Sequence, residues 1–359
     1  MRHSSPPISQ RIQSGISMIE LLVAMILVIV ILAGLISMFS SNKIAYTSQE
    51  SISRIQEAYR FASEIIQKEV RSAGYYGCNR ESSIVDTLSS LPFEADHTKP
   101  IEGFNATDAT TWDRAITPTS LTIGTTTGDI VRGGTDILVV RRVSDTQHAL
   151  NAAMATTSAS PQIAANISPV ALSVDDVAII SDCKRSAIFQ VTGFTIASGI
   201  IAHSTTGGSI GNSTAQLLTS APAFDLDADV MRFNTTVFFI GTSTNGTPSL
   251  KRKVNSAPSE IIIDGVENMQ ILYGLDTDAD GIANRYVNAS NITAVEWANV
   301  TSARISLLML APENSLPEND AETYVLLDES IADTGTTITH AGDLRFRQSV
   351  NMTVDIRNL

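Results

Sequence analysis

The chain has 359 residues, enough for one large or two ordinary domains, and only 17% of them are charged. Its 24 Lys and Arg against 37 Asp and Glu give a formal net charge of −13, and no long Lys/Arg run occurs. These values argue against a phosphate backbone as the main ligand, so we expect no nucleic-acid partner. The Ser, Thr, Asn, Ala and Asp content of the middle of the chain is more typical of an exported β-rich domain than of a cytosolic enzyme.

The N-terminal region predicts a membrane anchor. Residues 1–14 are polar, contain no acid and carry Arg2 and Arg11, and positive charge before an apolar run keeps that end cytoplasmic. The following stretch, Ile16–Phe39, is almost entirely apolar and would reach about 36 Å as a helix, enough for a ~30 Å hydrocarbon core. An ordinary secretory signal is shorter and ends in a small-residue cleavage site, so we expect this segment to stay attached.

The helical pattern continues beyond the apolar stretch. From Ser40 to Ala73 there is no proline, and apolar residues recur at steps of three and four. Glu50 and Arg54 form a favourable i,i+4 pair on the polar side. Gly74 is a suitable helix stop.

We therefore predict one helix of about 58 residues, roughly 87 Å long, apolar all round in its first half and amphipathic in its second. The alternative is a membrane span followed by a separate short helix, with breaks at Gly34 or Ser40–Asn42.

The remainder of the chain has the periodicity of strands. Residues 79–135 are weakly patterned, and we expect Phe104 and Trp112 to form small local cores in a surface excursion. Residues 149–168 and 197–221 are expected to be long loops. Strands are predicted at 137–143, 177–181, 187–192, 237–241, 249–254, 260–264, 269–275, 304–311 and 344–356. Because no helices separate them, we predict a mainly antiparallel sheet and an α+β fold.

The chain has two cysteines, Cys78 and Cys183, without the spacing of metal ligands. In an oxidising compartment the default is one disulfide, which would close a loop of about 105 residues and add at most about 4–5 kcal/mol. The alternative is two unrelated buried thiols.

An acidic loop with the pattern D-x-D-x-D-G-x-x-N is a candidate Ca²⁺ site. Its carboxylates would repel one another without a cation, and Gly281 permits a sharp turn. The usual glutamate at the twelfth position is missing, since Val287 stands there. The alternative is an acidic hairpin turn. The candidate ligands are Asp276, Asp278, Asp280, the Ile282 carbonyl and Asn284.

No catalytic constellation is predicted. Gly207–Gly211 matches G-x-S-x-G, but a nucleophile elbow needs a strand before it and a helix after it, so we interpret the match as coincidence. The histidines are scattered without metal or triad spacing; they include His97, His148, His203 and His340.

The stretch Gly15–Met25 (GISMIELLVAM) resembles the leader and helix start of type IV pilins and type II secretion pseudopilins, usually GFTLIELLVA. In that superfamily a prepilin peptidase cuts after the glycine and methylates the new amine. The resemblance therefore implies processing at Gly15 and Ile16. This chain departs from the usual form with Ile for Phe and Ser-Met for Thr-Leu.

Further segments resemble the PilW-type minor pilins. Arg71–Cys78 (RSAGYYGC) is similar to their R-x-A-G-Y-x-G-C stretch, and residues 181–192, 266–276 and 345–358 are similar to other parts of that family. Residues 79–135 and 145–170 carry no resemblance. A pilin-like α+β fold is implied, with a leader at 1–15, a transmembrane and assembly helix at 16–74 and a periplasmic head at 75–359.

Glu20 is the charge that such a helix must accommodate. An acid at the bilayer centre costs about 2.5–3.5 kcal/mol, and less near a helix end, so it usually has a partner. The amine of a neighbouring subunit at Ile16 would satisfy both charges and set the axial register, which is the role of the matching glutamate in pilins. The alternative places Glu20 at the headgroup level.

The resemblance implies a non-enzymatic minor pilin held in the bacterial inner membrane with its head in the periplasm. We expect it to prime pilus assembly and sit at or near the tip, with other minor pilins, pilus subunits and the prepilin peptidase as partners and roles in adhesion and twitching. Ca²⁺ is the one candidate cofactor. The alternatives are a minor pseudopilin of a type II secretion system and a membrane-anchored periplasmic enzyme.

Overall fold

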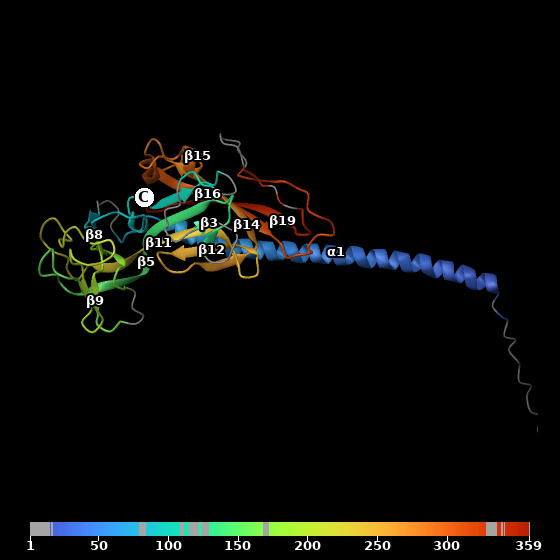
Figure 1. Ribbon diagram of the computed structural model, residues 1–359, viewed down its shortest axis with the longest axis horizontal. Coiled ribbons are helices and arrows are strands. Elements are labelled where there is room, and N and C mark those ends of the chain that lie inside the picture. The colour runs from blue at the N-terminus through green and yellow to red at the C-terminus, as the bar shows by residue number, and fades with distance from the viewer. Residues whose placement is uncertain are drawn as a thin grey trace, which may run out of the picture.

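In a computed structural model of the chain, one long helix leads into a β-rich head (Figure 1). The architecture is α+β, as predicted. The expected leader residues 1–14 and Ile16 lie outside the described part of the chain. The structure describes residues 15, 17–78, 84–107, 111–114, 122–123, 129–167, 172–327, 336–338, 340 and 342–358.

Helix α1 (Met18–Arg71) is continuous over 54 residues. Neither Gly34 nor the polar residues after Phe39 break it, so the single-helix prediction is confirmed. The helix ends with basic residues in its last turn, which suit the negative end of the helix dipole. Gly74 follows with φ of +74°, where a Cβ would lie 2.9 Å from the backbone oxygen of Asn358.

The two halves of α1 have different surroundings. The N-terminal half stands clear of the head (Figure 1), and its apolar side chains are exposed. It is long and apolar enough to cross a membrane. From Ser51 onwards one face is buried against the head, through residues such as Ile55, Ala62 and Ile66.

The main sheet contains most of the head's strands. Its path is β1 (Val85–Asp86), β8 (Ser186–Gln190), β7 (Val177–Ser181), β11 (Asp229–Thr242), β5 (Ile137–Ala152), β6 (Gln162–Ile163), β10 (Ile200–Ala202), β9 (Gly193–Thr195). Three more strands lie off this path: β2 (Ile101–Phe104) beside β5, β12 (Pro248–Val254) beside β11, and β13 (Glu260–Asp264) beside β12.

The second sheet has the order β15 (Arg285–Val287), β14 (Val266–Leu275), β16 (Val300–Leu310), β19 (Arg347–Asp355). Two small ribbons pair β3 (Thr122–Ile123) with β4 (Ile130–Val131) and β17 (Tyr324–Leu326) with β18 (Thr336–Ile338). Short 3-10 helices are η1 (Phe93–Ala95), η2 (Ala289–Asn291) and η3 (Glu296–Asn299). The described pairs are antiparallel except β1–β8 and β3–β4.

The buried face of α1 and the second sheet form one hydrophobic core, which includes Ile66, Ile271, Ile305 and Val354. A separate core, around Phe189 and Phe224, lies in the part of the head far from the membrane half of α1. Strands β5 and β11 pair along most of their length and run through both parts. The head therefore has two lobes, one around the core beneath α1 and a distal lobe around Phe189 and Phe224, which share the long strands β5 and β11.

Three loop expectations were wrong. Phe104 is on β2 in the main sheet and shares a buried cluster with Trp112 and Phe239, so it is not in a surface excursion. The four-residue strand was hidden because it contains Glu102, whose burial is balanced by an ion pair of 2.8 Å with Arg141. Likewise, β5 extends to Ala152, and β6 and β10 interrupt the two expected long loops.

Candidate functional site

Gly15 and Glu20 lie at the free end of α1. Glu20 is in the first helical turn, where a carboxylate interacts favourably with the helix dipole. Its Oε2 accepts a hydrogen bond of 3.3 Å from the backbone N–H of Ser17. Among the described residues this carboxylate has no ion pair, and its side chain is exposed. The geometry leaves Glu20 available to a charge from another molecule. Its predicted partner is the Ile16 amine of a neighbouring subunit, and Ile16 lies outside the described residues.

At the other end, α1 is fixed to the head by a buried ion pair. Arg142 on β5 donates to both carboxylate oxygens of Glu69, at 2.8 and 3.1 Å. Burial alone would lower the pKa of Arg142, but the hydrogen bonds and charge of Glu69 raise that pKa above its ordinary value. Asp145 contacts both Arg142 and Lys68. Sequence analysis missed this contact because Glu69 and Arg142 are 73 positions apart.

The end of α1 also meets the C-terminal residues. The backbone N–H of Arg357 and the side-chain amide of Asn358 both donate to the carbonyl of Arg71, at 3.3 Å. The side-chain amide of Asn358 lies 3.5 Å from the Ala73 carbonyl. Two segments that resemble the same family in the sequence are therefore adjacent in space.

The predicted disulfide between Cys78 and Cys183 is present, with 4.6 Å between the Cα atoms. Cys183 sits in the turn between β7 and β8, where its φ is +66°. The Asp182 carboxylate supports this turn by accepting hydrogen bonds from the backbone N–H groups of Lys184 and Arg185. The bond connects the segment after α1 to the lobe that carries β7 and β8.

The acidic loop joins β14 to β15, so the candidate ligands are in a hairpin turn. One carboxylate oxygen from each of Asp276, Asp278 and Asp280 can be chosen so that all lie within 4.8 Å of one another. The side-chain oxygen of Asn284 accepts a 2.6 Å hydrogen bond from the backbone N–H of Thr277. The three carboxylates fit a hard divalent cation, and the additional ligands Ile282 and Asn284 stay predictions.

Asp276 organises this turn. Its two oxygens accept hydrogen bonds of 2.7 Å from the backbone N–H groups of Ala279 and Gly281, and a third of 3.1 Å from Asp278. Partial burial works to raise the pKa of Asp276, but these hydrogen bonds outweigh it and lower the pKa. The Asp276 side chain is therefore ionised at neutral pH and already held in the turn.

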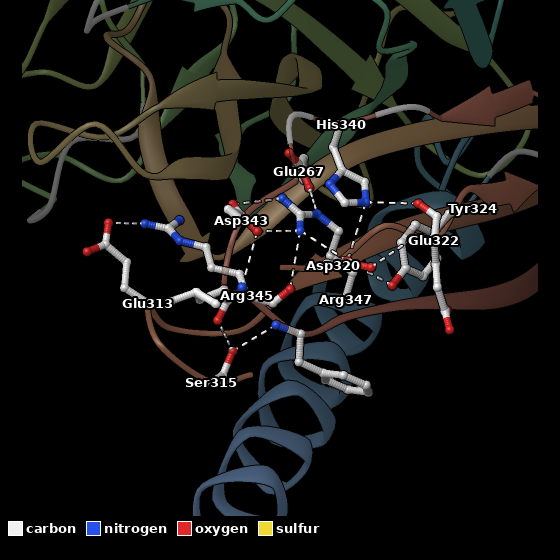
Figure 2. Close-up of polar contacts among 12 residues, drawn as sticks. Glu267, Glu313, Ser315, Asp320, Glu322, Tyr324, His340, Asp343, Arg345 and Arg347 are labelled. Carbon is white, nitrogen blue, oxygen red and sulfur yellow. Dashed lines mark hydrogen bonds and ion pairs between the residues drawn. The ribbon is translucent and has the colours of Figure 1, made fainter. Parts of the chain in front are cut away.

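A buried charge cluster is the feature that sequence analysis missed most completely (Figure 2). We define it as Arg347, Glu267, Asp320, Asp343 and His340. The side chain of Arg347 is 2% exposed, and its guanidinium contacts all three carboxylates, at 2.6 Å, 3.2 Å and 2.7 Å. His340 lies 3.3 Å from Asp320. The contributing residues come from β14, β19 and the segment between β16 and β19.

The cluster connects Asp320 and Asp343, which lie between β16 and β19, to the second sheet. Tyr324 donates a hydrogen bond of 3.1 Å to Asp320, and Arg345 forms an ion pair with Glu313 (Figure 2). Hydrogen bonding to Arg347 is the largest effect on Asp343 and lowers the pKa of that carboxyl. Since one guanidinium contacts carboxylates from β14 and from the segment before β19, the cluster connects these parts of the chain.

Asp136 is a second buried acid that the sequence did not single out. Its two oxygens accept hydrogen bonds of 2.8 Å from the backbone N–H groups of Ala106 and Ile271. Burial dominates and raises the pKa of Asp136 to about 7. The side chain joins the segment after β2 to β14, and so links the two sheets.

The G-x-S-x-G match has a structural explanation. Gln190 accepts hydrogen bonds from the backbone N–H groups of Ile210 and Gly211 and donates one of 2.9 Å to the Ser209 hydroxyl. Gly208 is required because a Cβ there would be 2.2 Å from Gln190 Oε1. The loop lies between β10 and β11, so it lacks the strand–turn–helix setting of a nucleophile elbow.

The comparisons with known proteins give one family match. Residues 237–358 match the family model described as PilW, type IV pilus-assembly protein W. The matched residues include part of β11, the second sheet, the acidic loop and the charge cluster, but not α1 or the cysteines. Neither the curated proteins nor the solved structures give a match. The match indicates a role in type IV pilus assembly, and the apolar half of α1 fits anchoring in a membrane.

Proposed function

We propose that this protein is a minor pilin of the PilW type, held in the bacterial inner membrane by α1 with its head in the periplasm. From there it joins other minor pilins in a complex that primes pilus assembly and remains at or near the tip. One observation carries the proposal: a continuous helix, apolar and free of the head in its first half, leads into a head whose C-terminal part matches the pilus-assembly family.

The geometry supports a mechanism of assembly through the helix. Glu20 supplies one fixed negative charge near the free end of α1, and the processed amine of a neighbouring subunit supplies the positive one. Pairing in lipid satisfies both charges, because an unpaired carboxylate there is costly. At the head end, Glu69 and Arg142 hold α1 firmly, so a shift of the helix carries the head with it.

The head favours a place at the tip. The distal lobe, which contains the core around Phe189 and Phe224, extends away from α1, beyond the sheet on which the helix is seated (Figure 1). A subunit inside a regular shaft has neighbours on all sides, whereas a subunit at the tip has fewer. The bulk of the distal lobe is therefore more compatible with the tip than with repeated positions along the shaft.

The first experiment replaces Gly15 by Val and determines the N-terminus of the membrane-extracted protein by mass spectrometry. We expect the native protein to begin at N-methyl-Ile16 and the variant to retain its leader. A Cβ at Gly15 meets nothing within 4 Å, so the fold itself tolerates the change. Loss of cleavage in the variant would therefore report recognition of Gly15 by the peptidase.

Gly34→Val is the matched control, since Gly34 is equally open and lies further along α1. We expect it to be processed normally. Normal maturation of the Gly15 variant would overturn the proposal. An uncut native protein would instead favour a simple membrane anchor, such as that of a periplasmic enzyme.

A minor pseudopilin of a type II secretion system shares the Gly15 and Glu20 features and is the alternative. Deletion of the gene separates the two functions. Loss of surface pili and twitching with normal secretion supports the pilus, and the reverse result supports the secretion system.

A further inference from the structure

The two sheets of the head are joined at Asp136, the residue before β5. Its backbone N–H donates to the Met269 carbonyl of β14 at 2.9 Å. Its carboxylate accepts hydrogen bonds of 2.8 Å from the backbone N–H groups of Ile271 on β14 and of Ala106 in the segment after β2. The nearby Gly134 carbonyl accepts two more, each of 3.0 Å, from side-chain amides of β14. We call this set of hydrogen bonds the sheet joint.

No cation balances the acid at the centre of the sheet joint. Asp136 is 3% exposed, and the described part of the chain gives it no ion pair. The charged group that acts on it is another acid, Asp113. Arg114 contacts Asp113 at 3.2 Å and Glu102 at 3.0 Å, so its charge is already shared by those two acids. A carboxylate buried without a cation is costly, and protonation removes that cost.

A buried hydroxyl lies close to the same joint. Tyr273 of β14 is 1% exposed, and its hydroxyl has no hydrogen-bond partner among the residues that the structure describes. The hydroxyl lies against β2, at Gly103, where a Cβ would clash with it. Burial raises the pKa of Tyr273 well above its ordinary value, and the charge of Asp136 adds to this shift. Entry of water into the joint would solvate both side chains.

We propose that the sheet joint is a proton-controlled latch between the two sheets. A neutral Asp136 carboxyl keeps the joint closed, and loss of its proton makes the joint open more often, so that water reaches Asp136 and Tyr273. The latch lies between the sheet that seats α1 and the sheet that carries the distal lobe. The proposal concerns the head alone and does not rest on the proposed function.

The groups that face the joint do not compensate for ionisation. They are Glu102 on β2, Asp113 and Arg114 in the segment after β2, and Tyr273 on β14. The one cation among them is already paired with both neighbouring acids. A negative charge formed at Asp136 is therefore added to a region that already contains two acids, and it weakens the closed joint.

The direction of the pH effect follows from the proton affinities of the closed and open joint. Burial, to which the charge of Asp113 adds, raises the pKa of Asp136 to about 7, whereas an exposed Asp titrates at about 3.9. The closed joint therefore binds the proton more tightly than the open joint. Its stability is greatest in acid, falls as pH rises towards about 7, and is nearly constant above that value.

The test measures hydrogen exchange at the Ala106 and Ile271 amides, which donate to Asp136, in the full-length protein in detergent. The observed exchange rate divided by the intrinsic rate at each pH gives the opening constant of the joint. We expect this constant to rise about fiftyfold between pH 5 and pH 7 and only about twofold more above pH 7. A constant that is unchanged or falls between pH 5 and pH 7 would overturn the proposal.

A third amide distinguishes opening of the joint from unfolding of the whole head. Ile305 lies in the middle of β16, which is paired on both sides. Its opening constant should be smaller than those of Ala106 and Ile271. Equal constants at the three amides would mean that the head opens as one unit, and the latch would be rejected.

A variant that cannot lose the proton isolates the role of the carboxyl. Asp136→Asn keeps one acceptor oxygen, and we expect it to reduce the rise between pH 5 and pH 7 to less than about fivefold. Asp227→Asn changes an exposed acid of the distal lobe and is the matched control, which should keep the full rise. The Cys78–Cys183 bond and slow exchange at Ile305 report that each variant is folded. A full rise in folded Asp136→Asn would overturn the proposal.

Asp113→Asn tests the same point without changing Asp136. It removes the neighbouring negative charge, so it lowers the pKa of Asp136, and the opening constant should level off at a lower pH than in the wild type. An unchanged levelling point would contradict the proposal even if Asp136→Asn failed to fold.

Discussion

In the proposed function, Glu20 is unfavourable for a single chain in a membrane but becomes a contact between subunits in the assembly. We expect Glu20→Ala to be cleaved and methylated normally, because the cut lies before α1, but to give at least tenfold fewer surface pili. Electron microscopy of cells, with N-terminal mass spectrometry, measures both effects.

Glu50→Ala is the matched control, since Glu50 is on the same helix in an exposed pair with Arg54. Such a pair contributes only about 0.3–0.5 kcal/mol, so pilus number should not change. Wild-type piliation of Glu20→Ala would remove that residue from assembly.

Unlike Glu20, Arg347 has several charged partners within its own chain. Replacing it by Met leaves Glu267, Asp320 and Asp343 without their common cation, and breaking a buried ion pair in this way costs about 3–5 kcal/mol. We expect the free energy of unfolding, measured by denaturant titration of the detergent-solubilised protein, to fall by that amount. Arg345→Met, which removes the partner of the exposed Glu313, should cost less than about 1 kcal/mol.

The difference in stability between wild type and Arg347→Met should depend on pH. The pKa of Asp343 is lowered in the folded state by its hydrogen bonds to Arg347. Its contribution to stability is therefore present above the unfolded pKa, about 3.9, and is lost as pH falls through the folded value. The difference in the free energy of unfolding between wild type and Arg347→Met should therefore shrink below about pH 4. Titration of Asp136 affects both proteins equally and does not change this difference. A constant gap down to pH 2 would contradict this account.

At the scale of elements, the acidic hairpin between β14 and β15 can be tested for Ca²⁺. The three carboxylates converge, so we expect isothermal titration of the chelator-treated protein to show binding in the millimolar range typical of extracellular sites. Asp278→Asn should weaken binding, because it removes a ligand charge without removing a hydrogen bond that holds the turn. Asp225→Asn, an exposed acid outside the loop, is the control, and no heat at millimolar Ca²⁺ would end the hypothesis.

The elements with a strong local pattern were predictable from the sequence. Helix α1 was predicted as one unit because apolar spacing and the absence of proline act along the whole segment. Strands β7 and β13 were predicted with the bounds that the structure shows. Each of these runs carries its own signal, so no distant residue is needed to recognise it.

The elements that depend on distant partners were not predictable. Strand β2 contains Glu102 and Gly103, and its buried acid pairs with Arg141 and Arg114, of which Arg141 is 39 positions away in the sequence. The charge cluster joins Glu267 to Arg347 across 80 positions, and no local spacing reports such a pair. In the acidic loop the pattern located the three converging carboxylates, but it did not indicate the hydrogen bond that the backbone N–H of Thr277 donates to Asn284.

For the whole molecule, the disulfide is the tie between the helix end and the distal lobe. Replacing both cysteines by Ser should lower the free energy of unfolding by up to about 4–5 kcal/mol, the chain-entropy value for a loop of this length. Hydrogen exchange should increase first in β7 and β8, which the bond holds. Reductant should destabilise the wild type and leave the double variant unchanged; equal sensitivity of the two would contradict the prediction.

The seat of α1 has a consequence for the order of synthesis. The Tyr59 hydroxyl binds Asn351, and the carbonyl of Arg71 binds Arg357 and Asn358, nearly 300 positions later. Strand β19, which flanks the helix, is also the last of the described strands that the ribosome makes. The helix is therefore translated at the start, but its docking surface is complete only after the C-terminal strand has been translated. A nascent chain that lacks β19 therefore cannot complete the packing of α1 against the head.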